Sequence, residues 1–366
     1  MFLPETPRGR LPELLSRPAI LLLSLFLLFG CGDSPTEPIT PRVMEVAFIS
    51  ARDGTTSIHA IRSDGTGLRR ITDGSRSENW YAWSPDGSKL AVEWSSPGEG
   101  WDPWVMNADG TDPLRLTRTP DILESWMQWS PDGSRLAFSA DNETGGHDIY
   151  TVTVDGDAAT NLTKQGPHQN GGPKWSPDGS RIAFVSLRDG NAEIYLMNPD
   201  GSGQTNITQT PDFDEGHLDW SPDGTRLTFV NSAKSGGNRD VFVMNLDGTG
   251  RRNLSQSPET EDLHPAWSPD GSRIAWDKYD EQFTGSLYVV NSDGSGLLEL
   301  APVGTGPAWS PDGSLIAFTG VGTVEGRQYA EVFLVAPDGT GLRILVTPDD
   351  PSGSHISSER PWRVVE

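Results

Sequence analysis

The chain has 366 residues and a formal net charge of −23, with 41 glycines, 29 prolines and a single cysteine. This acidic excess argues against a nucleic-acid partner, because binding to the phosphate backbone requires a basic surface. A single cysteine excludes an intrachain disulfide, and the length allows either two average domains or one large all-β domain.

The first 30 residues have the pattern of an export signal. Three arginines precede an apolar run from Ala19 to Phe29, which is too short to span a bilayer but suits the core of a signal peptide. The run ends at Leu28-Phe29-Gly30-Cys31, which resembles a bacterial lipobox. We therefore expect residues 1–30 to be a lipoprotein signal peptide, Cys31 to receive the lipid, and residues 31–42 to form a linker. The alternative is an ordinary secretory signal in which the cysteine is incidental.

From residue 43 onward the sequence repeats a unit of 42 to 47 residues. Each unit is marked by Trp-Ser-Pro-Asp-Gly followed by a short apolar run, and repeats of this length are typical of the blades of β-propellers. Glycine and proline recur at fixed places in the unit, which makes them turn residues and not a sign of disorder. The six copies begin at Trp83, Trp129, Trp175, Trp220, Trp267 and Trp309.

Within one unit the pattern predicts four short strands joined as a meander. In the third copy, runs of β-favouring residues over 181–186, 193–198 and 204–208 follow the Trp segment, separated by Gly, Pro, Asn and Asp. In the Ser-Pro-Asp-Gly turn, Pro presets φ, Asp bonds the local backbone and Gly takes positive φ. We expect the Trp to pack between adjacent blades.

A second kind of turn, Asp-Gly, occurs seven times against six Trp-Ser-Pro-Asp-Gly motifs. The first unit begins at Val43 with residues that align with the second strand of the repeat, whereas Ser357–Val365 aligns with the first strand. The two ends can complete one blade together, which leaves only short, protected edges. The sequence thus predicts an all-β, seven-bladed β-propeller over residues 43–366, with four-stranded blades and the first blade closed by the C-terminal strand.

Together these motifs resemble the repeat of TolB-type propellers, which are relatives of the WD-type repeat, over residues 43–366. TolB itself has a six-bladed propeller and an additional N-terminal domain, and the chain departs from it on both counts. Similar propellers form the non-catalytic domain of prolyl-oligopeptidase-like peptidases and the body of some oligogalacturonate lyases. The resemblance therefore implies a fold and leaves the function open.

The copies diverge in a patterned way just before each signature Trp. Carboxylates or an amide stand five residues before it, and aromatic or imidazole side chains three residues before it. We expect these residues, with two nearby loop residues, to form a rim at one end of the central channel. The predicted rim consists of Glu78, Trp80, Trp101, Glu124, Trp126, His168, Asn170, Glu215, His217, Asp262 and His264.

Three interpretations of this rim stay open. Its residues cap turns and pack strands; or they bind a peptide, a cation or a sugar-like ligand; or His217 and His264 hold a divalent metal with a nearby carboxylate. No Gly-x-Ser-x-Gly occurs, which argues against a hydrolase-type nucleophile.

We therefore favour a non-enzymatic, cofactor-free scaffold that binds an envelope protein or peptide. Lipid on Cys31 would anchor it to a membrane of the cell envelope, with the propeller facing the periplasm or the cell exterior. The alternative is a metal-dependent, carbohydrate-active enzyme similar to oligogalacturonate lyases.

Overall fold

The computed structural model describes residues 43–365 except for 96–99, 119–123, 165, 167, 236, 282–284, 325–326, 347–353 and 357–359. The predicted signal peptide, Cys31 and the linker lie outside the described residues. The described residues include no helix that is long and apolar enough to cross a membrane.

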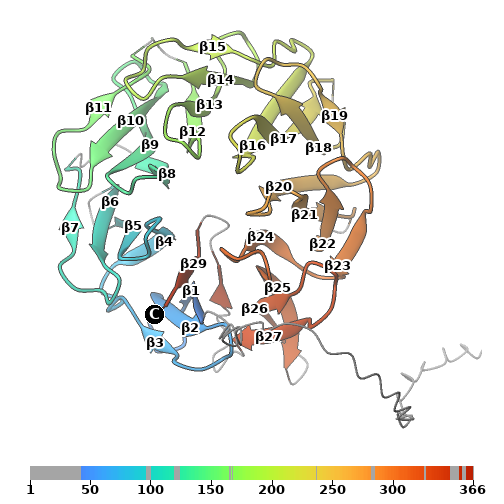
Figure 1. Ribbon diagram of the computed structural model, residues 1–366. Helices are drawn as coiled ribbons and strands as arrows, with labels where there is room; N and C mark the ends of the chain where they lie inside the picture. Colours follow the sequence, from blue (N-terminus) through green and yellow to red (C-terminus); the bar gives the residue numbers. More distant parts are fainter. Residues whose placement is uncertain are drawn as a thin grey trace, which may run out of the picture. The chain divides into compact units, whose positions relative to one another are not determined.

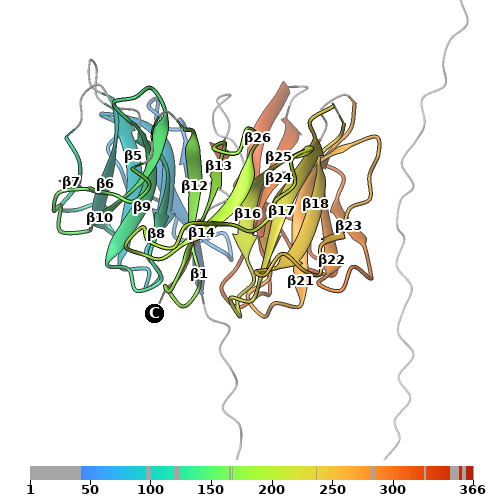
Figure 2. The same cartoon turned by 90° about the horizontal axis from the view of Figure 1, so that it is seen from above.

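Seven antiparallel sheets stand in a ring around a central axis, which confirms the predicted seven-bladed propeller (Figure 1). In the view turned by 90° the blades stand side by side around that axis (Figure 2). We number the blades 1 to 7 in chain order and name their strands a to d from the axis outward.

The strands follow the predicted meander in every blade. Blade 1 contains β1 (Met44–Ser50), β2 (Ser57–Arg62) and β3 (Arg69–Arg70), with β28 (Ser354–His355) and β29 (Trp362–Val364). Blades 2 and 3 contain β4 (Ser77–Trp83), β5 (Lys89–Ser95), β6 (Trp101–Asn107), β7 (Leu114–Arg115), β8 (Glu124–Trp129), β9 (Arg135–Asp141), β10 (His147–Thr153) and β11 (Thr160–Asn161). Blades 4 and 5 contain β12 (Asn170–Trp175), β13 (Ile182–Ser186), β14 (Glu193–Met197), β15 (Thr205–Asn206), β16 (Phe213–Trp220), β17 (Arg226–Ala233), β18 (Asp240–Asn245) and β19 (Arg252–Asn253). Blades 6 and 7 contain β20 (Glu261–Trp267), β21 (Arg273–Tyr279), β22 (Gly285–Asn291), β23 (Leu298–Ala301), β24 (Thr305–Trp309), β25 (Ile316–Val324), β26 (Arg327–Val335) and β27 (Arg343–Val346).

The Ser-Pro-Asp-Gly turn between strands a and b is held by its own side chains. In blade 4 the Ser176 hydroxyl donates to Asp178 Oδ1 at 2.6 Å, and the same carboxylate oxygen accepts the backbone N–H of Ser180 at 2.9 Å. Gly179 has φ of 70°, a value that glycine adopts at little cost. These hydrogen bonds lower the pKa of Asp178 to about 2. The aspartates of this signature therefore act as turn residues.

The signature tryptophans join neighbouring blades, as predicted. Trp129 is buried in blade 3, and its indole N–H donates to the carbonyl of Ala82 in blade 2 at 3.0 Å. Trp220 and Lys174 make the same contact between blades 5 and 4 at 3.0 Å. The hydrophobic core accordingly lies between blades: one cluster combines Ala91 and Val105 of blade 2 with Phe138 of blade 3.

Blade 1 is closed by the C-terminal segment. β29 pairs with β1 from Met44↔Val364 to Val46↔Trp362, and β28 pairs with the other end of the same strand. β28 and β29 together therefore form strand a of blade 1; β29 lies within the predicted segment 357–365, whereas β28 precedes it.

Candidate functional site

A β-bulge interrupts strand a just before the signature Trp. The pairing with strand b shifts between Ser125 and Gln128 in blade 3, and blades 4 to 7 shift at the equivalent position. In these five blades the residue three before the Trp has φ between 47° and 64°. Bulges re-aim side chains and are frequent beside functional sites.

Three of these left-handed residues carry side chains, namely Trp126, His217 and His264. The left-handed region disfavours residues with a Cβ and costs on the order of 1–3 kcal/mol for each such residue. Gly172 and Gly306 stand at the same place in blades 4 and 7 and fit it at little cost. The backbone strain thus falls on the positions at which the sequence repeats diverge.

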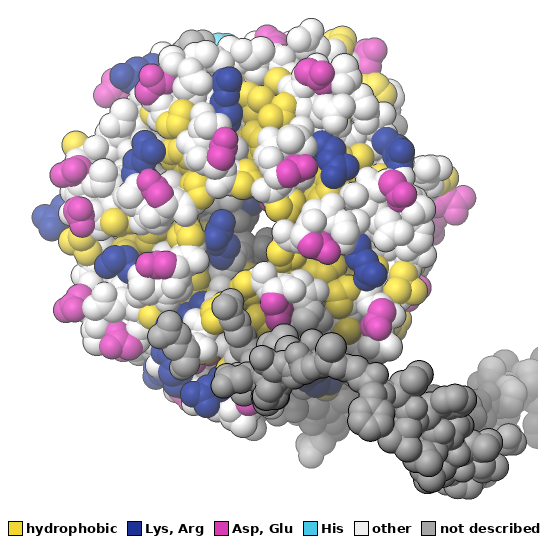
Figure 3. Space-filling model, in the orientation of Figure 1, with side chains coloured by type: hydrophobic (Ala, Val, Ile, Leu, Met, Phe, Trp, Pro, Cys, Tyr) yellow, Lys and Arg dark blue, Asp and Glu magenta, His cyan; other side chains and the backbone are white. Residues whose placement is uncertain are grey.

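These side chains line a cavity of about 1000 Å³ in the central channel. The space-filling view shows the central hollow with hydrophobic and Lys or Arg side chains around it (Figure 3). Trp126 is 63% exposed, the highest value among the described residues that are large and hydrophobic. The channel wall also carries Lys174, Arg360, Asp219 and several prolines. The cavity therefore offers both apolar and charged contacts.

The two histidines from blades 5 and 6 meet in the channel. The rings of His217 and His264 lie edge to face with centroids 4.8 Å apart. His264 Nδ1 lies 2.9 Å from Oδ2 of Asp277, a fully buried carboxylate that also accepts the backbone N–H of Gly306. Burial against the channel wall, and then the neighbouring His264, lower the pKa of His217 to about 4. His217 is therefore neutral at physiological pH.

This arrangement does not fit a metal centre. The described residues contain no group of three His, Cys, Asp or Glu side chains placed to hold a metal ion. The Nδ1 atom of His264 is also directed at Asp277, so a metal would have only the opposite ring nitrogen.

The residues five before the Trp lie inside their blades. Glu78, Glu124, Glu215 and Asp262 are buried, and none of them lines the channel cavity. Glu215 accepts a hydrogen bond from Arg251 Nη2 at 2.9 Å, and Asp262 accepts one from the indole N–H of Trp276 at 2.9 Å. These carboxylates hold strands together, in keeping with the structural interpretation of the rim.

Four further residues of the predicted rim lie at different depths. Trp80 is half-buried and lines the channel cavity, and buried Asn170 does so as well. Trp101 begins strand c of blade 2, and His168 precedes strand a of blade 4; neither lines that cavity. The structure therefore brings together Trp80, Trp126, Asn170, His217 and His264.

Sequence reasoning missed two polar residues on strand b. Asp277 orients His264, and Ser139 lines the cavity, with a buried hydroxyl oxygen that has no hydrogen-bond partner among the described residues. Both occupy the same place in the repeat, where blades 4 and 5 have Val185 and Val230. A comparison of the second strands, as well as the first, could have found them.

Comparisons with known proteins agree with the fold. The family model described as the TolB beta propeller domain matches residues 164–319 and 219–346, two overlapping stretches that together include 183 of the 366 residues. No curated protein matches the sequence significantly.

Several solved structures share the architecture. TolB from Acinetobacter baumannii is 18% identical, with a TM-score of 0.55 over 70% of this chain and 63% of that chain. An oligogalacturonate lyase in complex with manganese is 19% identical, with a TM-score of 0.65 over 80% of this chain and 85% of that chain. Puromycin hydrolase is 15% identical, with a TM-score of 0.65 over 87% of this chain and 57% of that chain.

This chain therefore spans less than two thirds of the Acinetobacter TolB structure and of puromycin hydrolase. At these identities the likeness concerns the fold and not the activity. With half of its residues matched by the family model and every blade built on the same repeat, the chain belongs to the TolB beta propeller domain family.

Proposed function

We propose that the protein is an exported, non-enzymatic binding protein whose central channel receives a polypeptide segment of an envelope partner. The main support for this proposal is the strained backbone and the high exposure of Trp126. Its indole packs over the backbone of Gly171, its φ is 54°, and the side chain is 63% exposed within the channel. A strained and exposed tryptophan costs free energy in the unbound protein, and Trp is enriched among the residues that dominate binding energies.

The other channel residues suit a polypeptide ligand. Apolar surface from Pro307 and Trp309 alternates with polar groups on the channel wall. Ser139, Gln128 and Lys174 are among the polar residues that line this wall. The amide and carbonyl groups of a peptide can form hydrogen bonds with such side chains. The wall therefore offers apolar surface for the side chains of a polypeptide and polar groups for its backbone.

Trp126→Ala should weaken capture of the partner from an envelope extract by roughly tenfold or more, because it removes a central aromatic anchor. Quantitative mass spectrometry of the proteins retained by the immobilised full chain measures the effect. Leu297→Ala is the matched control, since Leu297 is 51% exposed but does not line the channel cavity.

Equal capture by wild type and Trp126→Ala would contradict the channel as the binding surface. The enzymatic alternative has one supporting observation, the pairing of His264 with buried Asp277, which is the arrangement of an oriented acid–base imidazole. Turnover of acidic oligosaccharides that is lost in His264→Ala would support that alternative and contradict the non-enzymatic proposal.

We also propose that the propeller is anchored to a membrane through lipid on Cys31. Cells that express the protein should incorporate labelled palmitate into it, and Cys31→Ser should abolish the label and release the protein from the membrane fraction. Equal labelling of the Cys31→Ser protein would contradict the anchor.

A further inference from the structure

Strands b and c of each blade carry a pair of stacked or tilted rings. In five blades a cation stands over such a ring at 4.1 to 5.5 Å from a ring centroid. These cations reach the ring from different points in the repeat: the loop after strand b, the segment before strand a, the turn before strand d, or strand b itself. A cation is therefore found over the rings in these blades even though the side chain that supplies it comes from different positions of the repeat. The five are Arg52, Arg76, Arg188, Arg251 and Lys278.

Blade 5 shows how a guanidinium group is held there. The guanidinium carbon of Arg251 lies 5.2 Å from the ring centroids of both Phe229 and Phe242. Its Nη2 donates to Glu215 Oε1 at 2.9 Å, and Asn231 Nδ2 donates to the same oxygen at 3.0 Å. A carboxylate at the end of the group and a ring against its face are the two contacts that guanidinium prefers.

Blade 3 has an aromatic ring and a carboxylate at the equivalent positions of the repeat. Tyr150 pairs with Asn161 across strands c and d, as Phe242 pairs with Asn253 in blade 5. Glu124 stands five residues before its signature Trp, as Glu215 does, and its side chain is likewise buried.

The two donors of blade 5 are replaced by alanine in blade 3. Ala159 lies two residues before Asn161 and so occupies the place of Arg251, and Ala140 lies two residues after Phe138 and so occupies the place of Asn231. Among the described residues no Lys or Arg stands over the Phe138–Tyr150 pair. Blade 3 thus lacks the side chain that occupies this place in blade 5.

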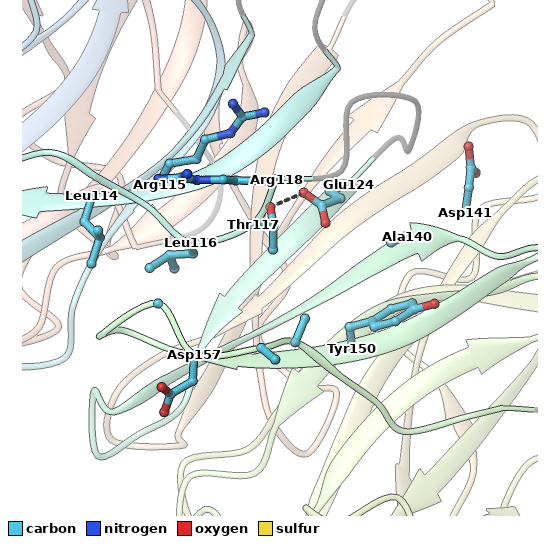
Figure 4. A pocket seen from close by; sticks show the side chains of 13 residues that line it. Leu114, Arg115, Leu116, Thr117, Arg118, Glu124, Ala140, Asp141, Tyr150 and Asp157 are labelled. Carbon is cyan, nitrogen blue, oxygen red and sulfur yellow. Dashed lines mark hydrogen bonds between the residues drawn. The ribbon is translucent and has the colours of Figure 1, made fainter.

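A cavity of about 410 Å³ occupies that place, between blades 2 and 3 (Figure 4). Glu124, Tyr150, Ala140 and Ala159 are among the residues that line it. The hydroxyl of Thr117 donates to Glu124 Oε2 on the blade 2 side. The cavity shares no lining residue with the channel cavity.

The charges around this cavity favour a cationic ligand. Two arginines line it, but Arg115 donates from Nη2 to Asp102 at 2.5 Å, and Arg118 is exposed. Asp157 and Asp141 line it as well, Asp141 lying 2.8 Å from His147 Nδ1, so that among the described lining residues three carboxylates, with Glu124, stand against two guanidinium groups. The buried Glu124 carboxylate would repel an anion at close range. A planar cation would instead lie between this carboxylate and the Tyr150 ring, and both would attract it.

We propose that this cavity binds a guanidinium group, which takes the position that Arg251 occupies in blade 5. The group comes either from an arginine side chain of a polypeptide or from a small guanidinium compound. The site is separate from the channel and does not depend on the function proposed for it.

The test is saturation-transfer NMR on the full chain with N-acetyl-arginine amide, ethylguanidinium and, as the uncharged control, N-acetyl-citrulline amide. We expect saturable binding of the guanidinium compounds and binding of the citrulline compound that is about tenfold weaker or less. Tighter binding of N-acetyl-arginine amide than of ethylguanidinium would identify an arginine side chain as the ligand, and equal binding a small guanidinium compound.

Two variants make the test independent of ligand choice. Ala159→Arg should supply the missing side chain, abolish binding and melt at a higher temperature than Ala159→Met, which fills the cavity without charge. Arg251→Ala should open an equivalent cavity in blade 5 and gain a second site for ethylguanidinium.

Absence of saturable binding to the wild-type chain, equal binding of the citrulline compound, or melting of Ala159→Arg below Ala159→Met would each overturn the proposal.

Discussion

Removal of residues 354–366 should leave a chain that does not hold its native fold. The segment supplies strand a of blade 1, and the indole N–H of Trp362 donates to Ala308 of blade 7 at 2.9 Å. Its Arg363 Nη2 lies 2.6 Å from Glu45 of blade 1 and the guanidinium stacks over Trp83 of blade 2. Three blades lose contacts at once, and domains are stable by only about 5–15 kcal/mol in total.

The single substitution Trp362→Ala should cost about 3–5 kcal/mol of the free energy of unfolding, as for other large buried side chains. Chemical denaturation of the full-length variants measures this loss. Val364→Ala is the control on the same strand, because Val364 is 40% exposed, and surface changes usually stay within about 0.5 kcal/mol. A truncated chain that melts at the same temperature as the full-length chain would show that the ring is stable without its closing strand.

The second large effect is a fall in stability as the pH rises from about 4.5 to 7. Burial raises the pKa of Glu78 to about 7, of Glu93 to about 7 and of Asp262 to about 6. The folded chain therefore binds these protons more tightly than the unfolded chain, whose glutamates titrate near 4.5. Their stabilising protonation is complete below the unfolded pKa values, 4.5 for the two glutamates and 3.8 for Asp262, and is lost as the pH rises to the folded pKa values, at about 1.4 kcal/mol per pH unit for each group.

Glu93→Gln tests this prediction directly. The amide keeps an oxygen that can accept the hydrogen bond from Asn79 Nδ2, which is 2.7 Å long in the wild type, and it carries no charge. We expect the variant to be more stable at pH 8 by on the order of 3 kcal/mol and to show a shallower loss between pH 4.5 and 7. Urea denaturation at several pH values provides the measurement, with the exposed Glu143→Gln as control. An unchanged pH slope would contradict the raised pKa.

Acidification below pH 4 should also lower the stability, through a different set of carboxylates. Hydrogen bonds from Ser130 and Ser134 lower the pKa of Asp132 in the turn to about 2, and Asp178 behaves in the same way. The stability that such turns contribute is present above pH 4 and is lost as the pH falls toward 2. The stability of the propeller is thus expected to be highest near pH 4.5.

The sequence predicts the fold well because a propeller repeats one local design. The turn residues, the inter-blade Trp129 and the shared closure of blade 1 each follow from local chemistry or from counting motifs. All three are present in the structure.

The candidate site is less accessible to sequence reasoning because it depends on backbone geometry. Spacing places Trp126 and His217 at one end of the channel, but it does not reveal that they lie on strand a, in a bulge that gives them positive φ, where they line the channel cavity. Nor does it distinguish them from Glu124 and Glu215, which stand two residues earlier and are buried inside their blades. Asp277 lies 13 positions after His264, on another strand, and only the pairing of the two strands brings them together.

The shared construction of blade 1 also determines the order in which the molecule can fold. Blades 2 to 7 pair consecutive strands, which are local contacts that form quickly. Blade 1 must instead join Glu45 to Arg363, which lie 318 positions apart along the chain. Until that segment has emerged from the ribosome, β1 has an unpaired inner edge that is open to association with other chains. The return of the last strand to the first is therefore expected to be the slowest step of folding and the one most exposed to aggregation.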